Sequence, residues 1–281
     1  MSRIAYVNGS YVSHREAAVS IDDRGYQFGD GVYEVVYIID GHLADEDAHL
    51  DRLSRSLNEI SMPMPVTRNV LKMIMARIIR LNQVQTGLIY LQVTRGVARR
   101  DHKWSANLKP ALVITAKNTM AKMPEEVAPV EVITVPDERW DRRDIKTIQL
   151  LPNCLAKQKA FEAGAYEALM IDKDGSITEG SSSNAWLVTK DGVLVTRPAT
   201  HKILNGITRR AVMAVAQELQ LRIEERDFTV AEIKEASEAF LTSASSLVTA
   251  IGSIDGDKVN NGGVGPVAKR LRIAYIEEVT S

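Results

Sequence analysis

The sequence is almost without cysteine. Cys154 is the single one among 281 residues, so no disulfide can form within the chain. The N-terminal residues include no apolar segment of the kind that directs secretion. The five histidines are scattered and lack the spacing of zinc ligands. We therefore expect a cytoplasmic protein with no metal site.

The chain also lacks an excess of either charge and lacks long apolar runs. Lys and Arg number 35 against 36 Asp and Glu, a net charge of −1. Such a balance creates no field that would attract nucleic acid or an anionic membrane. No apolar run approaches the length needed to cross a bilayer. We expect no nucleic acid and no membrane among its partners.

Hydrophobic patterning predicts an α/β protein with two domains. A strand at 32–39 and helices at 45–60 and 70–81 have apolar residues at the periods of those structures. We expect an α+β domain over residues 1–118, a polar linker at 119–126, and a second domain over 127–281. The second domain is expected to contain short strands, one of them at 145–150, and helices at 208–219 and 265–279.

Two segments about thirty residues apart are the first indication of chemistry. Lys146 lies in an apolar run, and Glu179 precedes a run of small hydroxyl residues, Ser181, Ser182 and Ser183. Pyridoxal phosphate needs a lysine amine to hold its aldehyde as a Schiff base and an acid to keep its ring nitrogen protonated. Small donors near helix starts suit its phosphate. Alone, these fragments also allow a surface lysine and an ordinary polar turn.

A longer set of motifs resembles one family of enzymes. Residues 24–36 read RGYQFGDGVYEVV, and further blocks lie at 49–53, 92–96, 144–146, 155–158, 179–184 and 203–209. Together and in this order, they resemble the fold-type IV pyridoxal-phosphate enzymes, and most closely the D-amino-acid aminotransferases. The resemblance implies a smaller α+β domain, a larger barrel-like cofactor-binding domain, and a homodimer whose active sites are shared across the interface.

The resemblance also assigns cofactor roles to matching positions. Lys146 would form the internal aldimine and move a proton between Cα and C4′, and Glu179 would pair with the pyridine nitrogen. Arg52 would reach the phosphate, although periodicity places it off the apolar stripe of its helix, as on a solvated face. The other implied cofactor contacts are Ser181, Ser182, Ser183, Leu204, Ile207, Thr208, Ser243 and Ala244.

Thr208 and Ala244 differ from a simple phosphate contact. Thr208 begins a predicted helix, so it is also expected to cap that helix. Ala244 stands where the family usually has a threonine, so one hydroxyl is missing and only a backbone N–H could serve the phosphate beside Ser243.

The substrate end of the motif set indicates a carboxylate. The resemblance implies that Arg100 and His102 bind the substrate α-carboxylate, which suits the paired donors of an arginine, and that Tyr33 adds its hydroxyl. Arg99 is adjacent, and the two-residue spacing to His102 favours Arg100. From the residues alone, a solvated loop of mixed charge is the simpler interpretation.

The expected reaction is transfer of an amino group between D-amino acids and 2-oxo acids. D-alanine and D-glutamate, with pyruvate and 2-oxoglutarate, are the substrates that the resemblance suggests. A branched-chain L-amino-acid aminotransferase and an aminodeoxychorismate lyase share the fold and remain alternatives. A protein that binds the cofactor without turnover is a third, and the presence of both Lys146 and Glu179 argues against it.

Overall fold

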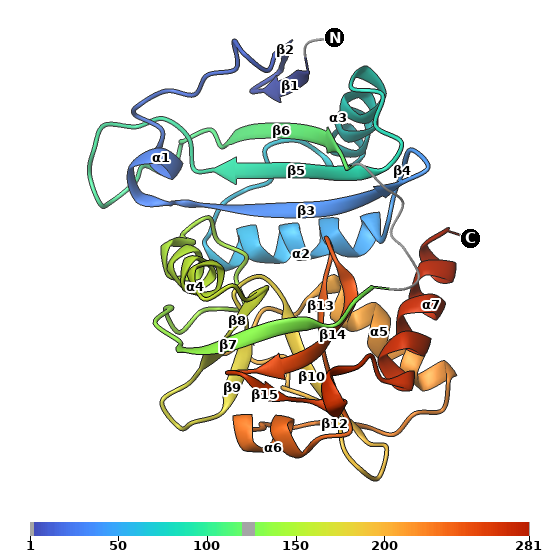
Figure 1. Cartoon of the computed structure of the whole chain (residues 1–281). Coiled ribbons are helices and arrows are strands. Elements are labelled where there is room, and N and C mark those ends of the chain that lie inside the picture. The colour runs from blue at the N-terminus through green and yellow to red at the C-terminus, as the bar shows by residue number, and fades with distance from the viewer. Residues whose placement is uncertain (1–2, 120–126, 281) are drawn as a thin grey trace. The chain divides into compact units, whose positions relative to one another are not determined.

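The computed structural model describes residues 3–119 and 127–280 and has a mixed α/β architecture (Figure 1). It divides into two compact units. Unit 1 is Met1–Lys122 with Ile145–Gln149, and unit 2 is Met123–Asp144 with Leu150–Ser281. Most of the predicted linker at 119–126 lies outside the described residues. No helix in the described ranges is long and apolar enough to span a membrane.

Unit 1 is built on a six-stranded sheet in the order β2-β1-β6-β5-β3-β4. The strands are β1 (Ile4–Val7), β2 (Ser10–Ser13), β3 (Gly31–Ile39), β4 (His42–Leu43), β5 (Gly87–Thr94) and β6 (Ala111–Asn118). The first two form a hairpin at Asn8 and Gly9, whose φ angles of 45° and 101° are both positive. An Asn-Gly pair is the sequence signal for this turn.

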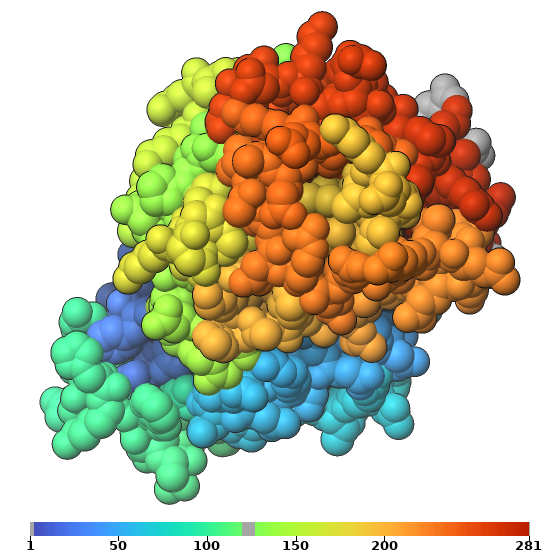
Figure 2. Space-filling model, turned by 90° about the horizontal axis from the view of Figure 1, so that it is seen from below, coloured from blue at the N-terminus to red at the C-terminus, as the bar shows by residue number. Residues whose placement is uncertain are grey.

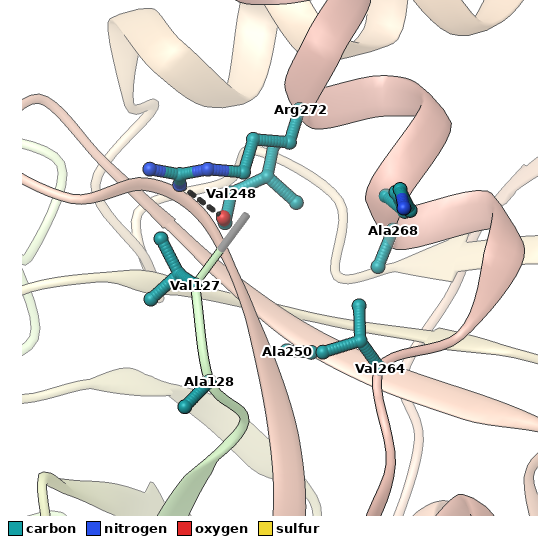
Figure 3. Close-up of a pocket in the computed structure, with 8 residues that line it drawn as sticks. Val127, Ala128, Val248, Ala250, Val264, Ala268 and Arg272 are labelled. Carbon is teal, nitrogen blue, oxygen red and sulfur yellow. Dashed lines mark hydrogen bonds between the residues drawn. The ribbon is translucent and has the colours of Figure 1, made fainter. Parts of the chain in front are cut away.

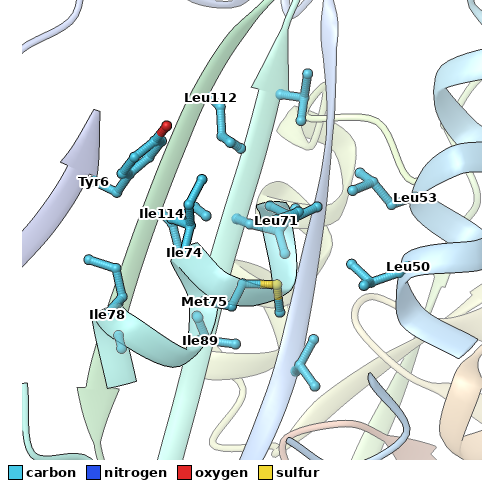
Figure 4. Close-up of a cluster of buried hydrophobic side chains, with 14 of the residues drawn as sticks. Tyr6, Leu50, Leu53, Leu71, Ile74, Met75, Ile78, Ile89, Leu112 and Ile114 are labelled. Carbon is cyan, nitrogen blue, oxygen red and sulfur yellow. The ribbon is translucent and has the colours of Figure 1, made fainter. Parts of the chain in front are cut away.

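The helices of unit 1 are α1 (Arg24–Phe28), α2 (Glu46–Glu59) and α3 (Arg68–Leu81). Both longer helices lie within about two residues of the predicted spans, because their apolar residues recur at helical spacing. Leu50 and Leu53 of α2 and Leu71 and Met75 of α3 pack with the strands into one core (Figure 4). Val32, Val36 and Ile38 bring one face of β3 into this core, so alternate residues of β3, Glu34 among them, point toward the helices.

The segment 145–149 belongs to unit 1 although its neighbours in sequence belong to unit 2. The predicted strand at 145–150 is wrong, since only one isolated bridge forms here, between Thr147 and Val32. Backbone bonds add to it, from Tyr33 N to Lys146 O at 3.0 Å and from Ile148 N to Gly31 O at 3.1 Å. Contact with β3 therefore replaces the regular ladder that the apolar pattern predicts.

Unit 2 contains a curled nine-stranded sheet in the order β12-β11-β10-β13-β14-β7-β8-β9, with β15 beside β14. The curl follows from its connectivity, because β9 and β10 are consecutive in the chain yet far apart in the sheet order. The strands are β7 (Val130–Pro136), β8 (Glu167–Ile171), β9 (Ile177–Gly180), β10 (Asn184–Val188), β11 (Leu194–Thr196), β12 (Ile223–Glu225), β13 (Glu238–Ser243), β14 (Leu247–Ile254) and β15 (Asp257–Lys258).

The helices of unit 2 are α4 (Leu151–Glu162), α5 (Ile207–Glu218), α6 (Val230–Glu235) and α7 (Pro266–Thr280), with a 3₁₀ turn at Asn260–Gly262. The predicted helices at 208–219 and 265–279 correspond to α5 and α7, whereas α4 was not predicted. β11 pairs in parallel with β12. Figure 2 shows one face of the molecule, where yellow residues lie beside orange residues from later in the chain.

Candidate active site

Lys146 is fixed at the edge of β3 by its own backbone. Its carbonyl accepts the N–H of Tyr33, and its N–H donates to Oγ of Ser56 at 3.4 Å. The Lys146 ammonium lies 4.3 Å from the centroid of the Tyr33 ring, where a cation is attracted by the ring face. The side chain is half-buried. It is thus held against an aromatic ring, unlike a solvated surface lysine.

Arg52 lies in a buried cluster with Glu34 and His49. Its Nε and one terminal nitrogen donate to the two carboxylate oxygens of Glu34, both at 2.7 Å, and His49 Nδ1 lies 2.8 Å from the same carboxylate. Glu34 has no exposed surface. Periodicity alone would place Arg52 on a solvated face, and the structure instead buries it. Glu34 could have been found from sequence, because it alternates with Val32 and Val36 on the core face of a strand.

The charges in this cluster stabilise one another. Burial alone would raise the pKa of Glu34, but the Arg52 guanidinium and the His49 ring lower it to about 2. Burial lowers the pKa of His49, and the nearby cations lower it further, although Glu34 opposes this. At neutral pH the cluster consists of a carboxylate, a guanidinium and a neutral imidazole.

Glu179 is buried at the end of β9, within unit 2. Its carboxylate accepts hydrogen bonds from Arg139 at 2.5 Å, from the side-chain amide of Asn184 at 2.9 Å, and from the backbone N–H of Leu204 at 3.1 Å. Burial raises the pKa of Glu179, whereas Arg139 and the Leu204 N–H act in the opposite direction. The carboxylate is thus held in one orientation by a guanidinium, a side-chain amide and a backbone N–H.

Arg139 is a residue that the sequence interpretation missed. It lies just after β7 and is paired with Asp137. The Nε of Arg139 donates to one carboxylate oxygen of Asp137 at 3.0 Å, and a terminal nitrogen donates to the other at 2.8 Å. Thr178 Oγ1 in turn donates to Asp137 at 2.7 Å. Polar residues immediately after a buried strand were the available signal, because side chains at strand ends often line sites.

Ser181, Ser182 and Ser183 form the tight turn between β9 and β10, closed by a bond from Gly180 N to Ser183 O of 2.7 Å. All three hydroxyls contact the buried Glu167 of β8. Glu167 was not predicted as a site residue. Its sequence neighbours give no hint, since the contact spans about fifteen residues.

The start of α5 contains Ile207 and Thr208, both buried. Thr208 does not cap the helix as predicted, because Gly206 occupies the cap position with φ −59° and ψ 139°, and Thr208 is already helical. No side chain caps this helix start. The N–H groups of its first turn therefore remain suited to an anion.

Ser243 ends β13 and begins a turn of hydroxyl residues. Its Oγ accepts the N–H of Ser246 at 3.2 Å and lies 2.7 Å from Ser246 Oγ. Ala244 follows within this turn and offers only its backbone. The hydroxyl of Ser243 is thus engaged in local structure.

The loop after β5 holds Arg100 and His102, both exposed. The Arg100 guanidinium lies 4.8 Å from the centroid of the Phe28 ring, and the His102 ring lies 5.8 Å from it. Buried Arg24 donates to the backbone carbonyls of Asp101 and His102, at 2.6 and 3.1 Å, and so fixes the course of the loop. Within the described parts of the chain, no hydrogen bond or ring contact joins Tyr33 to Arg100 or His102.

A separate cavity of about 410 Å³ lies in unit 2 between β14 and α7 (Figure 3). It contains none of the predicted site residues. Its walls are small apolar side chains with a basic end, formed by Val127, Ala128, Val248, Ala250, Val264, Ala268, Lys269 and Arg272.

Each unit contains groups of the kinds that pyridoxal phosphate requires. The structure supplies a lysine amine placed on an aromatic ring, a buried carboxylate with an arginine partner, and a helix start without a side-chain cap. These are the amine, acid and anion-binding groups that this cofactor requires.

The comparisons with known proteins agree with this chemistry. Residues 31–254 match the family described as amino-transferase class IV. The chain therefore belongs to the class IV aminotransferases, which are pyridoxal-phosphate enzymes of fold type IV.

Individual relatives and solved structures within this family are also similar to the chain. The chain is 43% identical to a D-alanine aminotransferase from Bacillus licheniformis, covering 98% of this chain and 96% of the relative. It is 39% identical to the D-alanine aminotransferase of Staphylococcus aureus (strain COL), covering 98% of each. A T.th. branched-chain amino acid aminotransferase, solved with pyridoxamine 5'-phosphate, superposes with a TM-score of 0.91 at 26% identity, covering 100% of this chain and 95% of the other.

Proposed function

We propose that this aminotransferase exchanges amino and oxo groups between D-amino acids and 2-oxo acids in a ping-pong cycle. D-alanine and D-glutamate are the proposed amino donors, and pyruvate and 2-oxoglutarate the acceptors. The observation that carries the proposal is the end-to-end likeness to D-alanine aminotransferases at 37–43% identity. The likeness to branched-chain aminotransferase structures is weaker, at about 25%.

Pyridoxal phosphate, when bound, supplies an electron sink that stabilises negative charge developing at the substrate Cα. Lys146 would bind the cofactor aldehyde and, once released, move the proton at Cα as a general base and acid. Glu179 would face the ring nitrogen and hold its proton, and Arg139 would keep Glu179 oriented for that contact.

The phosphate would be held by groups from both ends of the motif set. Arg52 donates from Nε and from one terminal nitrogen to the carboxylate of Glu34, and this pairing would orient the guanidinium toward the phosphate. The first turn of α5, with Ile207 and Thr208, would add backbone N–H groups and a hydroxyl. A backbone donor from the Ser243–Ala244 turn is the remaining candidate.

The substrate carboxylate would be bound by Arg100, His102 and Tyr33. In the described parts of a single chain, no hydrogen bond or ring contact joins Tyr33 to Arg100 or His102, which supports a trap completed by a second copy. We therefore propose a homodimer in which the loop of one subunit reaches the cofactor of the other. A cytoplasmic location is part of the proposal, because the lone cysteine permits no intrachain disulfide.

The test is a comparison of amino donors with 2-oxoglutarate as the acceptor. D-alanine should give pyruvate at a rate far above the rate at which L-leucine gives 4-methyl-2-oxopentanoate. Equal or inverted rates would contradict the D-specific proposal and favour the branched-chain alternative. Formation of pyruvate from aminodeoxychorismate by elimination, without an oxo-acid acceptor, would instead indicate the lyase.

A further inference from the structure

The turn formed by Ser181, Ser182 and Ser183 rests on a buried carboxylate that has no assigned role. Glu167, on β8, is 1% exposed. Its Oε2 receives Ser182 Oγ at 2.9 Å, Ser183 Oγ at 3.1 Å and Ser182 N at 3.3 Å. Its Oε1 receives Ser181 Oγ and, at 3.0 Å, the N–H of Ala168.

Among the described residues, each polar group that contacts the Glu167 carboxylate is a hydrogen-bond donor. Besides the five donors named above, the Lys157 ammonium is a sixth, and its Nζ lies 3.6 Å from Oε1 of Glu167. Three hydroxyls, two backbone N–H groups and one cation thus surround two oxygens that, when ionised, can only accept. This arrangement matches a carboxylate with its accepting positions filled, and it compensates the cost of burying the charge.

The three serine hydroxyls consequently donate their protons to Glu167 and not to the opposite side of the turn. A hydroxyl has one hydrogen to donate and two lone pairs to accept with. Because all three serines donate to Glu167, what they offer outward is lone pairs. The N–H of Ser182 also faces Glu167, and the N–H of Ser181 donates to Ala168 O at 3.0 Å.

The turn is built to keep this orientation. A Cβ at Gly180 would collide with Ser183 Oγ and come within 3.1 Å of the Glu167 side chain, so a glycine is required there. From α4, the side-chain amide of Asn153 donates to Ser181 O at 2.8 Å. The turn is therefore held by hydrogen bonds to Glu167 of β8 and to Asn153 of α4.

We propose that Glu167 is a positioning residue that makes the 181–183 turn a hydrogen-bond acceptor surface. The turn then recognises groups that carry hydrogen on the pyridine part of the cofactor, such as its ring hydroxyl, and does not hold the phosphate. A phosphate dianion requires donors, and these hydroxyls have none left to give. This inference rests on the proposed function, since it concerns the same site.

The test compares pyridoxal phosphate with pyridoxal, which lacks the phosphate, as ligands of the cofactor-free protein. Ser182→Ala and Ser183→Ala should raise the dissociation constants of both ligands by the same factor, within about twofold, because the phosphate contributes nothing at the turn. Arg52→Ala, by contrast, should weaken pyridoxal phosphate at least about tenfold more than pyridoxal, as expected for a lost charged contact. A serine variant with the phosphate-selective loss of Arg52→Ala would overturn the assignment.

The role of Glu167 itself is tested by Glu167→Gln. The amide group would point a donor at surrounding donors, so one serine must turn outward. We expect faster hydrogen exchange at the Ser182 amide in the cofactor-free protein and about tenfold weaker binding of both ligands. Glu162→Gln removes the same charge from an exposed position on α4. It should leave the hydrogen exchange of the Ser182 amide and the two dissociation constants unchanged.

Two outcomes distinguish a failure of this inference from a failure of the proposed function. If Glu167→Gln only lowers the melting temperature while both dissociation constants stay at the wild-type values, Glu167 is structural and the inference is wrong. If the wild-type protein binds neither ligand, the proposed function fails and the inference fails with it.

Discussion

At the residue scale, the Glu34–Arg52 ion pair is buried in unit 1 and holds a residue proposed to bind phosphate. A buried guanidinium is tolerated only with a partner that satisfies its donors, because an unpaired buried ion costs several kcal/mol. Glu34 is that partner, and His49 completes the cluster from the preceding turn of α2. The residue proposed to bind phosphate is therefore held in place before any anion arrives.

Glu34→Gln should make the stability of the cofactor-free protein less dependent on acid pH. The folded pKa of Glu34 is about 2, below its ordinary value of 4.5, so its contribution is present above pH 4.5 and is lost as pH falls toward 2. A shift of this size corresponds to about 3 kcal/mol at neutral pH. Denaturant unfolding should show the wild-type advantage shrinking by about 2 kcal/mol between pH 7 and pH 3.

Glu59→Gln, at an exposed position at the end of α2, is the control for that measurement and should follow the wild-type profile. A constant difference between wild type and Glu34→Gln at both pH values would show that the Glu34 pKa is not depressed.

Arg100→Ala should weaken the use of D-alanine more than the use of a primary amine without a carboxylate. Loss of a charged hydrogen bond costs about 1.5–3 kcal/mol, which corresponds to a fall in kcat/KM of roughly ten- to a hundredfold. Arg99→Ala is the matched control at the neighbouring position. Equal losses for both substrates, or a larger loss in Arg99→Ala, would contradict the assignment of Arg100.

At the element scale, the start of α5 links helix geometry to the acid site. Gly206 caps the helix, and a Cβ there would collide with Oδ1 of Asn184. Asn184 is the residue whose amide donates to both Glu179 and the carbonyl of Leu204, each at 2.9 Å. The same side chain thus sets the position of the helix start and of the buried carboxylate.

Gly206→Ala should therefore damage two functions at once. Displacing Asn184 in a packed region should cost about 1–3 kcal/mol of unfolding free energy. It should also weaken pyridoxal-phosphate binding, measured by titration of the cofactor-free protein. Gly263→Ala is the control, because its Cβ meets only an ordinary contact at 3.6 Å with φ −100°. Wild-type affinity in Gly206→Ala would exclude this coupling.

At the scale of the whole molecule, the proposed shared site makes a quantitative prediction. Lys146→Ala should be nearly inactive with D-alanine, and Arg100→Ala should keep at most about a tenth of the wild-type kcat/KM. In a mixed dimer, the subunit that keeps Lys146 would receive Arg100 from its partner, so one of the two sites is intact. Random exchange makes about half of the dimers mixed, and roughly a quarter of the wild-type sites should return.

The measurement is D-alanine turnover after subunit exchange, with mixed dimers confirmed by mass. Each parent variant exchanged with itself serves as the control. Activity that stays at the level of the parents would mean that each chain uses its own Arg100.

Local sequence determined much of the fold and the family. The periodicity of α2 and α3 predicted both helices, and Asn8-Gly9 predicted the hairpin turn, because these features depend on residues close in the chain. The ordered motifs around Lys146 and Glu179 were sufficient to indicate a fold-type IV aminotransferase, which the family match confirmed.

The partners of the site residues were decided only by the tertiary structure. Arg139 lies forty residues from Glu179, Glu167 about fifteen from the serine turn, and Glu34 eighteen from Arg52. The segment 145–149 likewise joins unit 1 although the chain around it lies in unit 2. Hydrophobic periodicity reports which face of an element is buried, whereas the pairing of buried charges depends on which elements meet, and that is settled only when the whole chain packs.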